Sequence, residues 1–196
     1  MSNDISALPA PLDAQQELLD QIPRLPILPG ENAAAFEDLR QALLSELNPS
    51  SPYQMSLAEN LIALEWEIHR HRSLSEGLLR KHFREAAQEV WEKDLLGAFS
   101  QFGEASSEAK DFAEGLLDPL SEQSATSLAW LEERNIGVSE IAAAAYENAG
   151  RALVPHETKL ADLEIRRRRL REDYDRLKVA NTRPIEDAQF VAGHGD

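Results

Sequence analysis

The sequence predicts an all-α protein, an elongated helical bundle with one long central helix and a C-terminal helix of the coiled-coil type. The main observation is the choice of apolar residues, because the 196 residues include 28 Leu but only 5 Val and 3 Thr. Leu loses little rotamer freedom in a helix, whereas β-branched side chains pack best on a pleated sheet. No segment alternates β-branched residues as a strand does, so we expect no sheet.

Proline and charge divide the chain into four expected segments. Residues 1–30 hold five of the ten prolines and form a Pro-rich N-terminal arm, because dense proline cannot continue a helix and favours extended backbone. We expect this arm to lie along the helical body or along a partner. Residues 31–155 form the helical body, residues 156–183 an Arg-rich heptad helix and residues 184–196 a flexible tail.

The helical body begins with a helix over residues 33–47, for which Asn32 is a suitable N-cap. The stretch from Pro52 to Pro119 contains no other proline. Its apolar residues recur at helical spacing and predict one long helix of about 45 residues. Gly77 or Gly97 is the expected place for a bend or a break in that helix.

Three shorter helices are expected after the long one, over residues 106–117, 121–133 and 140–153. Ser139 is the expected cap of the third, and Pro155 is expected to end it. The final helix then runs from residue 157 to about residue 180.

The final helix carries a heptad pattern, with spacings that alternate between three and four residues. The positions of this heptad seam are Leu160, Leu163, Arg167, Leu170, Tyr174, Leu177 and Asn181. We expect the seam to be buried against another helix, either the long helix of the same chain or the same helix of a second chain. The polar positions Arg167 and Asn181 favour a symmetric pair, and therefore a homodimer.

The distribution of charge raises the question of nucleic acid. The net charge of −15 argues against such a partner, yet half of all Lys and Arg lie in residues 151–196. Possible phosphate contacts are Arg166, Arg168, Arg169 and Arg171. Acids four residues away favour a solvent-facing helix with surface ion pairs of about 0.2–0.5 kcal/mol each. The expected pairs are Asp162–Arg166, Glu164–Arg168, Arg169–Asp173, Arg171–Asp175 and Glu172–Arg176.

We predict no catalytic residue, no cofactor and no metal site. The chain has no cysteine, so it lacks disulfides, thiolate metal ligands and a Cys nucleophile. The Glu/His segment 65–71 lacks the paired Glu-x-x-His motifs of a di-iron bundle. His156 with Glu157 lacks the second histidine of a zinc-protease motif. The three tryptophans, Trp66, Trp91 and Trp130, are expected to anchor a core or an interface.

Three further patterns point away from other classes of protein. Residues 126–148 have the layout of a helix-turn-helix, but the second helix offers no Arg or Lys over residues 140–148, so an ordinary helical hairpin is expected. The first ten residues lack the basic and apolar regions of a signal peptide. No stretch approaches about 18 uninterrupted apolar residues. We expect a soluble, cytoplasmic protein without a membrane partner.

The chain has an opening Pro29-Gly30-Glu31 helix with Phe36, Leu39, Leu43, Glu46, Leu47 and Pro49, followed by the segment Leu64–Arg72. These features give the chain a resemblance to a family of uncharacterised bacterial helical proteins. The resemblance covers about residues 25–80. It implies an all-helical fold and no activity, and it assigns no functional residue.

Together these patterns predict a non-enzymatic protein that binds protein, as a self-associating adaptor or a regulatory subunit. The long proline-free helix, the heptad seam and the Pro-rich arm favour this interpretation. The alternative is a nucleic-acid-associated regulator of mobile-element or phage origin that uses the Arg-rich helix. An enzyme whose polar groups converge from distant helices is a third possibility.

Overall fold

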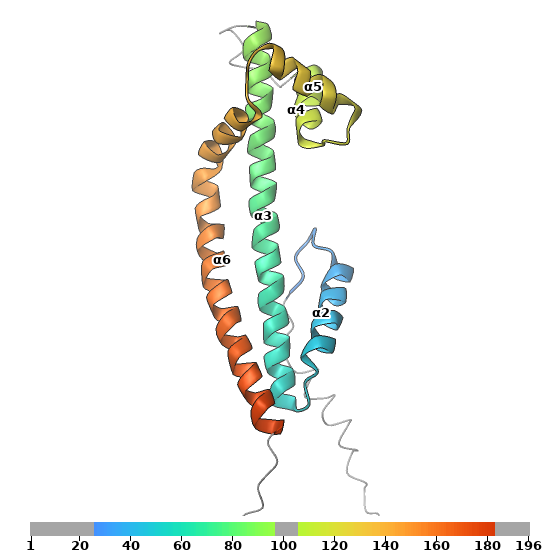
Figure 1. The fold of residues 1–196 in the computed structure, drawn as a ribbon, viewed down its shortest axis with the longest axis vertical. Helices are drawn as coiled ribbons and strands as arrows, with labels where there is room; N and C mark the ends of the chain where they lie inside the picture. The colour runs from blue at the N-terminus through green and yellow to red at the C-terminus, as the bar shows by residue number, and fades with distance from the viewer. Residues whose placement is uncertain (1–25, 97–105, 183–196) are drawn as a thin grey trace, which may run out of the picture. The chain divides into compact units, whose positions relative to one another are not determined.

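The computed structural model describes residues 26–96 and 106–182, and most of these residues lie in helices. Its helices are α2 (Ala33–Leu47), α3 (Pro52–Leu96), α4 (Ser107–Leu117), α5 (Glu122–Glu133) and α6 (Val138–Thr182) (Figure 1). Helices hold 86% of the described residues, and none of those residues lies in a strand. The all-α fold class is therefore confirmed.

The chain forms two compact units, and both long helices contribute to each. Of the described residues, the terminal unit comprises 26–68 and 163–182, and the middle unit comprises 69–96 and 106–162. This division differs from the sequence-based boundary at residue 155, because the terminal unit joins two segments far apart in the sequence, while the middle unit is one continuous stretch.

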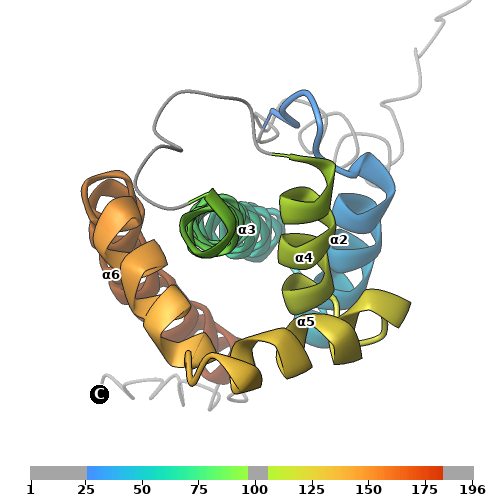
Figure 2. The ribbon, with the colours of Figure 1, turned by 90° about the horizontal axis from the view of Figure 1, so that it is seen from above.

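In the terminal unit, α2 and the last part of α6 flank the first part of α3 (Figures 1 and 2). The start of α2 follows from local chemistry, since the Asn32 side chain accepts hydrogen bonds from the backbone N–H groups of Ala34 and Ala35. The helix ends at Asn48, which adopts a left-handed φ of 48° and donates its N–H to the Leu44 carbonyl at 2.9 Å.

The core of the terminal unit includes an aromatic pair between α2 and α3. Phe36 and Trp66 meet edge to face with ring centroids 5.2 Å apart. The Trp66 indole N–H donates to the Glu31 carboxylate at 3.2 Å, so the segment before α2 is tied to α3. Ile27, at the described end of the Pro-rich arm, packs against the same cluster. Residues 1–25 of the arm lie outside the described part of the chain.

The middle unit is built from the last part of α3, from α4 and α5, and from the first part of α6. In it, α4 and α6 lie on different sides of α3 (Figure 2). α4 and α5 approach closely at Gly115, where an added Cβ would lie 2.5 Å from the Ser127 Oγ. That hydroxyl donates to the Phe112 carbonyl at 3.1 Å. One buried cluster of the unit consists of Ala86, Ala87, Phe112, Ala113, Leu131 and Ile141.

Several expected helix boundaries are wrong. Pro155 lies inside α6 and does not end it. Pro155 is exposed, while Leu153 is buried and His156 contacts α3, so packing on both sides of the proline offsets its missing hydrogen bond. Gly77 lies within a continuous α3, and Gly97 falls outside the described residues. α6 also begins at Val138, so Ser139 lies inside the helix and is not its cap.

Candidate functional site

The heptad seam of α6 packs against helices of the same chain. In the terminal unit, Leu163 and Tyr174 are 0% and 1% exposed. Leu170 joins Tyr174 in a cluster with residues of α2 and α3, namely Leu44, Leu47, Leu57, Ala58 and Leu61. The Tyr174 hydroxyl donates to the Leu47 carbonyl at 3.0 Å. Leu160, Arg167 and Leu177 are half-buried, and the Asn181 side chain lies outside the described residues.

The polar seam position Arg167 is also satisfied within the chain. Its guanidinium lies 3.3 Å from the Glu65 carboxylate of α3 and 2.6 Å from the Glu164 carboxylate of α6. Within the chain, α3 thus supplies a partner for this polar position, and the symmetric pair of chains stays a prediction.

The four possible phosphate contacts fall into two groups. Arg171 bonds Glu46 at 3.2 Å and Asp175 at 3.4 Å. Two of the expected surface pairs form, Arg171–Asp175 and Glu172–Arg176. The other three candidates, Arg166, Arg168 and Arg169, are exposed and make no ion pair within the described residues.

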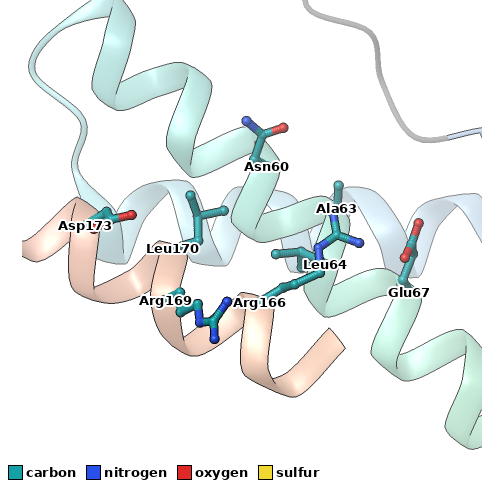
Figure 3. Close-up of a pocket in the computed structure, with 8 residues that line it drawn as sticks. All are labelled: Asn60, Ala63, Leu64, Glu67, Arg166, Arg169, Leu170 and Asp173. Atoms are coloured by element: carbon teal, nitrogen blue, oxygen red, sulfur yellow. The ribbon is translucent and has the colours of Figure 1, made fainter. Parts of the chain in front are cut away.

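Arg166 and Arg169 line a groove of about 450 Å³ between α3 and α6 of the terminal unit (Figure 3). Asn60, Ala63, Leu64 and Glu67 of α3 and Leu170 and Asp173 of α6 complete its lining. A second hollow, of about 440 Å³, is lined by three arginines and three glutamates together with Leu43, Leu47 and Leu61. Each hollow balances its cations with as many carboxylates, so neither is a strongly positive site for phosphate.

Two histidines from separate sequence motifs meet in the middle unit. The Nδ1 atoms of His71 in α3 and His156 in α6 are 2.9 Å apart. At this distance one ring donates its N–H and the other accepts, so the pair links the two helices. No group of three His, Cys, Asp or Glu side chains suited to a metal ion occurs in the described part of the chain. Sequence reasoning considered both motifs but did not anticipate that they meet.

An aromatic pocket of about 310 Å³ opens on the middle unit. Its apolar wall consists of Trp91 from α3, Phe112 from α4 and Trp130 from α5, whose ring centroids are 4.8–4.9 Å apart. Phe112 is 4% exposed, and both tryptophans are half-buried. The rings therefore pack on one another and also present apolar surface to the pocket.

Carboxylates surround this aromatic wall. Glu108 and Asp111 of α4 and Glu122 of α5 line the pocket and are exposed. None of the three forms an ion pair within the described residues. Gln123, Thr126 and Ser127 of α5 complete the lining. The pocket thus combines aromatic rings with unneutralised negative charge.

The same aromatic cluster has two other polar features. The Arg134 guanidinium carbon lies 3.9 Å from the centre of the Trp130 ring, and Arg134 also bonds Asp94 at 2.7 Å. The Trp91 indole N–H is buried and has no acceptor in the described part of the chain. A buried donor of this kind is unusual, since most buried polar groups are hydrogen-bonded.

Comparisons with known protein families, with curated proteins and with solved structures found no match for this chain. Among the described residues, no helix combines the length and the apolar character needed to cross a bilayer.

Sequence patterns indicated only some of the residues that line the pocket. Trp91 and Trp130 were expected to be core or interface anchors, and they line its wall. The acids of the rim were missed, although residues 101–150 hold ten acids and two bases. Glu108 and Asp111 are three positions apart on one helix, but only the packing of α4 against α5 brings Glu122 to the same pocket.

Proposed function

We propose that this chain is a non-enzymatic protein-binding protein and that the aromatic pocket of the middle unit is its docking surface. The observation that supports the proposal is the open aromatic wall of Trp91, Phe112 and Trp130. Tryptophan is one of the residues that most often dominate binding energy at protein interfaces, together with tyrosine and arginine. The heptad seam is less suited to this role, because α2 and α3 already cover it in the terminal unit.

Covalent capture at the pocket tests this proposal. A photoreactive amino acid is placed at Thr126, which is exposed and lines the pocket. In a matched variant it is placed at Ala125, which is exposed on the same helix and is not part of the pocket lining. After irradiation in cells of the native host, we expect discrete adducts from the Thr126 position that are missing from the Ala125 position. No adduct at Thr126, or the same adducts at both positions, would contradict the proposal.

A nucleic-acid-associated regulator remains the second candidate. The observation in its favour is that Arg166, Arg168 and Arg169 are exposed without an ion pair in the described part of the chain. The carboxylates of Glu67 and Asp173 in the same groove weaken it, because they repel phosphate.

A further inference from the structure

We infer that the occupant of the aromatic pocket is a basic peptide segment, which places an arginine or lysine side chain against the tryptophans and between the carboxylates. This inference rests on the proposed protein-binding function and names the chemistry of the partner.

The charge of the pocket is the first argument for a basic partner. Glu108, Asp111 and Glu122 bring three carboxylates to one apolar hollow without an ion pair to neutralise them in the described residues. An acidic or purely apolar partner would leave these charges uncompensated or would desolvate them, at a cost in free energy. A cationic side chain provides complementary charge instead.

The aromatic wall is the second argument, because a tryptophan ring of the middle unit already contacts a guanidinium of the same chain. Arg134 lies over the face of Trp130 at 3.9 Å while Asp94 accepts its Nε–H at 2.7 Å. A ring face and a carboxylate thus hold a cation together in this cluster. The pocket offers the same two elements, rings and carboxylates, to a cation from outside the chain.

The indole of Trp91 favours a peptide over a simple ion. Trp91 lines the pocket, and its N–H is buried without an acceptor in the described residues. A metal ion or an ammonium ion offers no acceptor, whereas a peptide brings carbonyl groups together with its cationic side chain. Some movement of the pocket wall is required for a carbonyl to reach that N–H.

Selection from a random peptide library, with the full-length protein as target, tests the inference without a known partner. One variant carries Glu108→Gln, Asp111→Asn and Glu122→Gln. The matched control carries Glu132→Gln, Glu147→Gln and Glu157→Gln, three exposed acids of the same unit outside the pocket. Both variants change the net charge by three, so both weaken non-specific attraction of cations alike.

We expect the selected peptides to share an arginine or lysine, and to bind the pocket variant at least about tenfold more weakly while the control variant changes less than about twofold. Thr126→Arg, which fills the pocket with its own cation and leaves the carboxylates intact, is expected to block the same peptides. It therefore tests the inference even if the triple variant folds poorly.

Selected peptides that lack a basic residue, or equal losses in the two triple variants, would overturn the inference. The outcome is separable from that of the proposed function. If Thr126 captures a partner whose cross-linked segment carries no arginine or lysine, protein binding stands and the basic peptide does not. If Thr126 captures nothing, the proposed function itself fails.

Discussion

At the scale of single residues, the hydroxyl of Tyr174 shows how one buried polar group joins distant segments of the terminal unit. It donates to the Leu47 carbonyl at 3.0 Å, and the Lys178 ammonium donates to the same carbonyl at 3.0 Å. Burial raises the pKa of Tyr174 above its ordinary value of 10.0. The neutral phenol is therefore the form that the folded protein prefers.

This preference predicts an alkaline dependence of stability. The unfolded chain ionises Tyr174 first, so the stabilisation is complete below about pH 10 and is lost as the pH rises further. Tyr174→Phe should remove this part of the pH dependence and lower the free energy of unfolding by about 0.5–1.5 kcal/mol below pH 10. We expect a value near the lower end of this range, because Lys178 still donates to the Leu47 carbonyl. Urea unfolding at about pH 8 and pH 10.5 measures both effects.

Tyr146→Phe is the control for this measurement, because Tyr146 is 59% exposed. It should leave stability and its alkaline dependence close to those of the wild type. If Tyr174→Phe loses as much stability above pH 10 as the wild type does, the alkaline dependence does not come from Tyr174.

At the scale of elements, two helical glycines separate the effect of backbone propensity from that of packing. Gly77 in α3 has no atom within 4 Å of an added Cβ, whereas at Gly115 in α4 the added atom would lie 3.0 Å from the Gln123 carbonyl. Gly77→Ala should stabilise the protein by about 0.5–1 kcal/mol. Gly115→Ala should destabilise it by about 1–3 kcal/mol. Thermal melting compares the two, and a Gly115→Ala protein as stable as the wild type would show that α4 and α5 do not pack as described.

The heptad seam gives a second test at this scale. Leu170→Glu places a charge in the cluster around Tyr174 and should lower the free energy of unfolding by about 2–3 kcal/mol. Because α2 and α3 of the same chain cover Leu170, the mass measured by light scattering should not change. The control is Ile165→Glu, on a residue of α6 that is 40% exposed and should tolerate the change. A dimer that becomes monomeric while staying folded would place the seam between chains.

Helix starts were predictable where capping is local. Asn32 and Ser106 bond backbone N–H groups within the next three residues, so the sequence alone indicates the starts of α2 and α4. The continuation of α6 through Pro155 was not predictable, because it depends on packing across the middle unit. For the aromatic pocket, the sequence indicated that Trp91 and Trp130 are anchors. It did not indicate that they meet Phe112, because the three rings come from three helices and meet only in the folded chain.

At the scale of the whole molecule, the net charge of −15 opposes nucleic acid. Any DNA or RNA binding should be weak, should depend on Arg166, Arg168 and Arg169, and should fall steeply with salt. Replacing these three arginines with glutamine should abolish what binding exists in fluorescence anisotropy. Sub-micromolar, sequence-selective binding at about 150 mM salt would instead promote the nucleic-acid candidate to first place.

Fluorine NMR of fluorotryptophan-labelled protein tests the central claim, that the pocket of the middle unit takes a cationic side chain, most directly. The chain has three tryptophans, of which Trp91 and Trp130 line the pocket, while Trp66 is buried in the terminal unit and serves as an internal reference. The probe is N-acetyl-arginine methylamide, and its citrulline analogue has nearly the same shape without the charge. We predict saturable shifts of the Trp91 and Trp130 resonances with the arginine compound, weaker shifts with citrulline, and no shift of Trp66. Equal responses to both compounds, or no saturable shift at either pocket tryptophan, would contradict the claim.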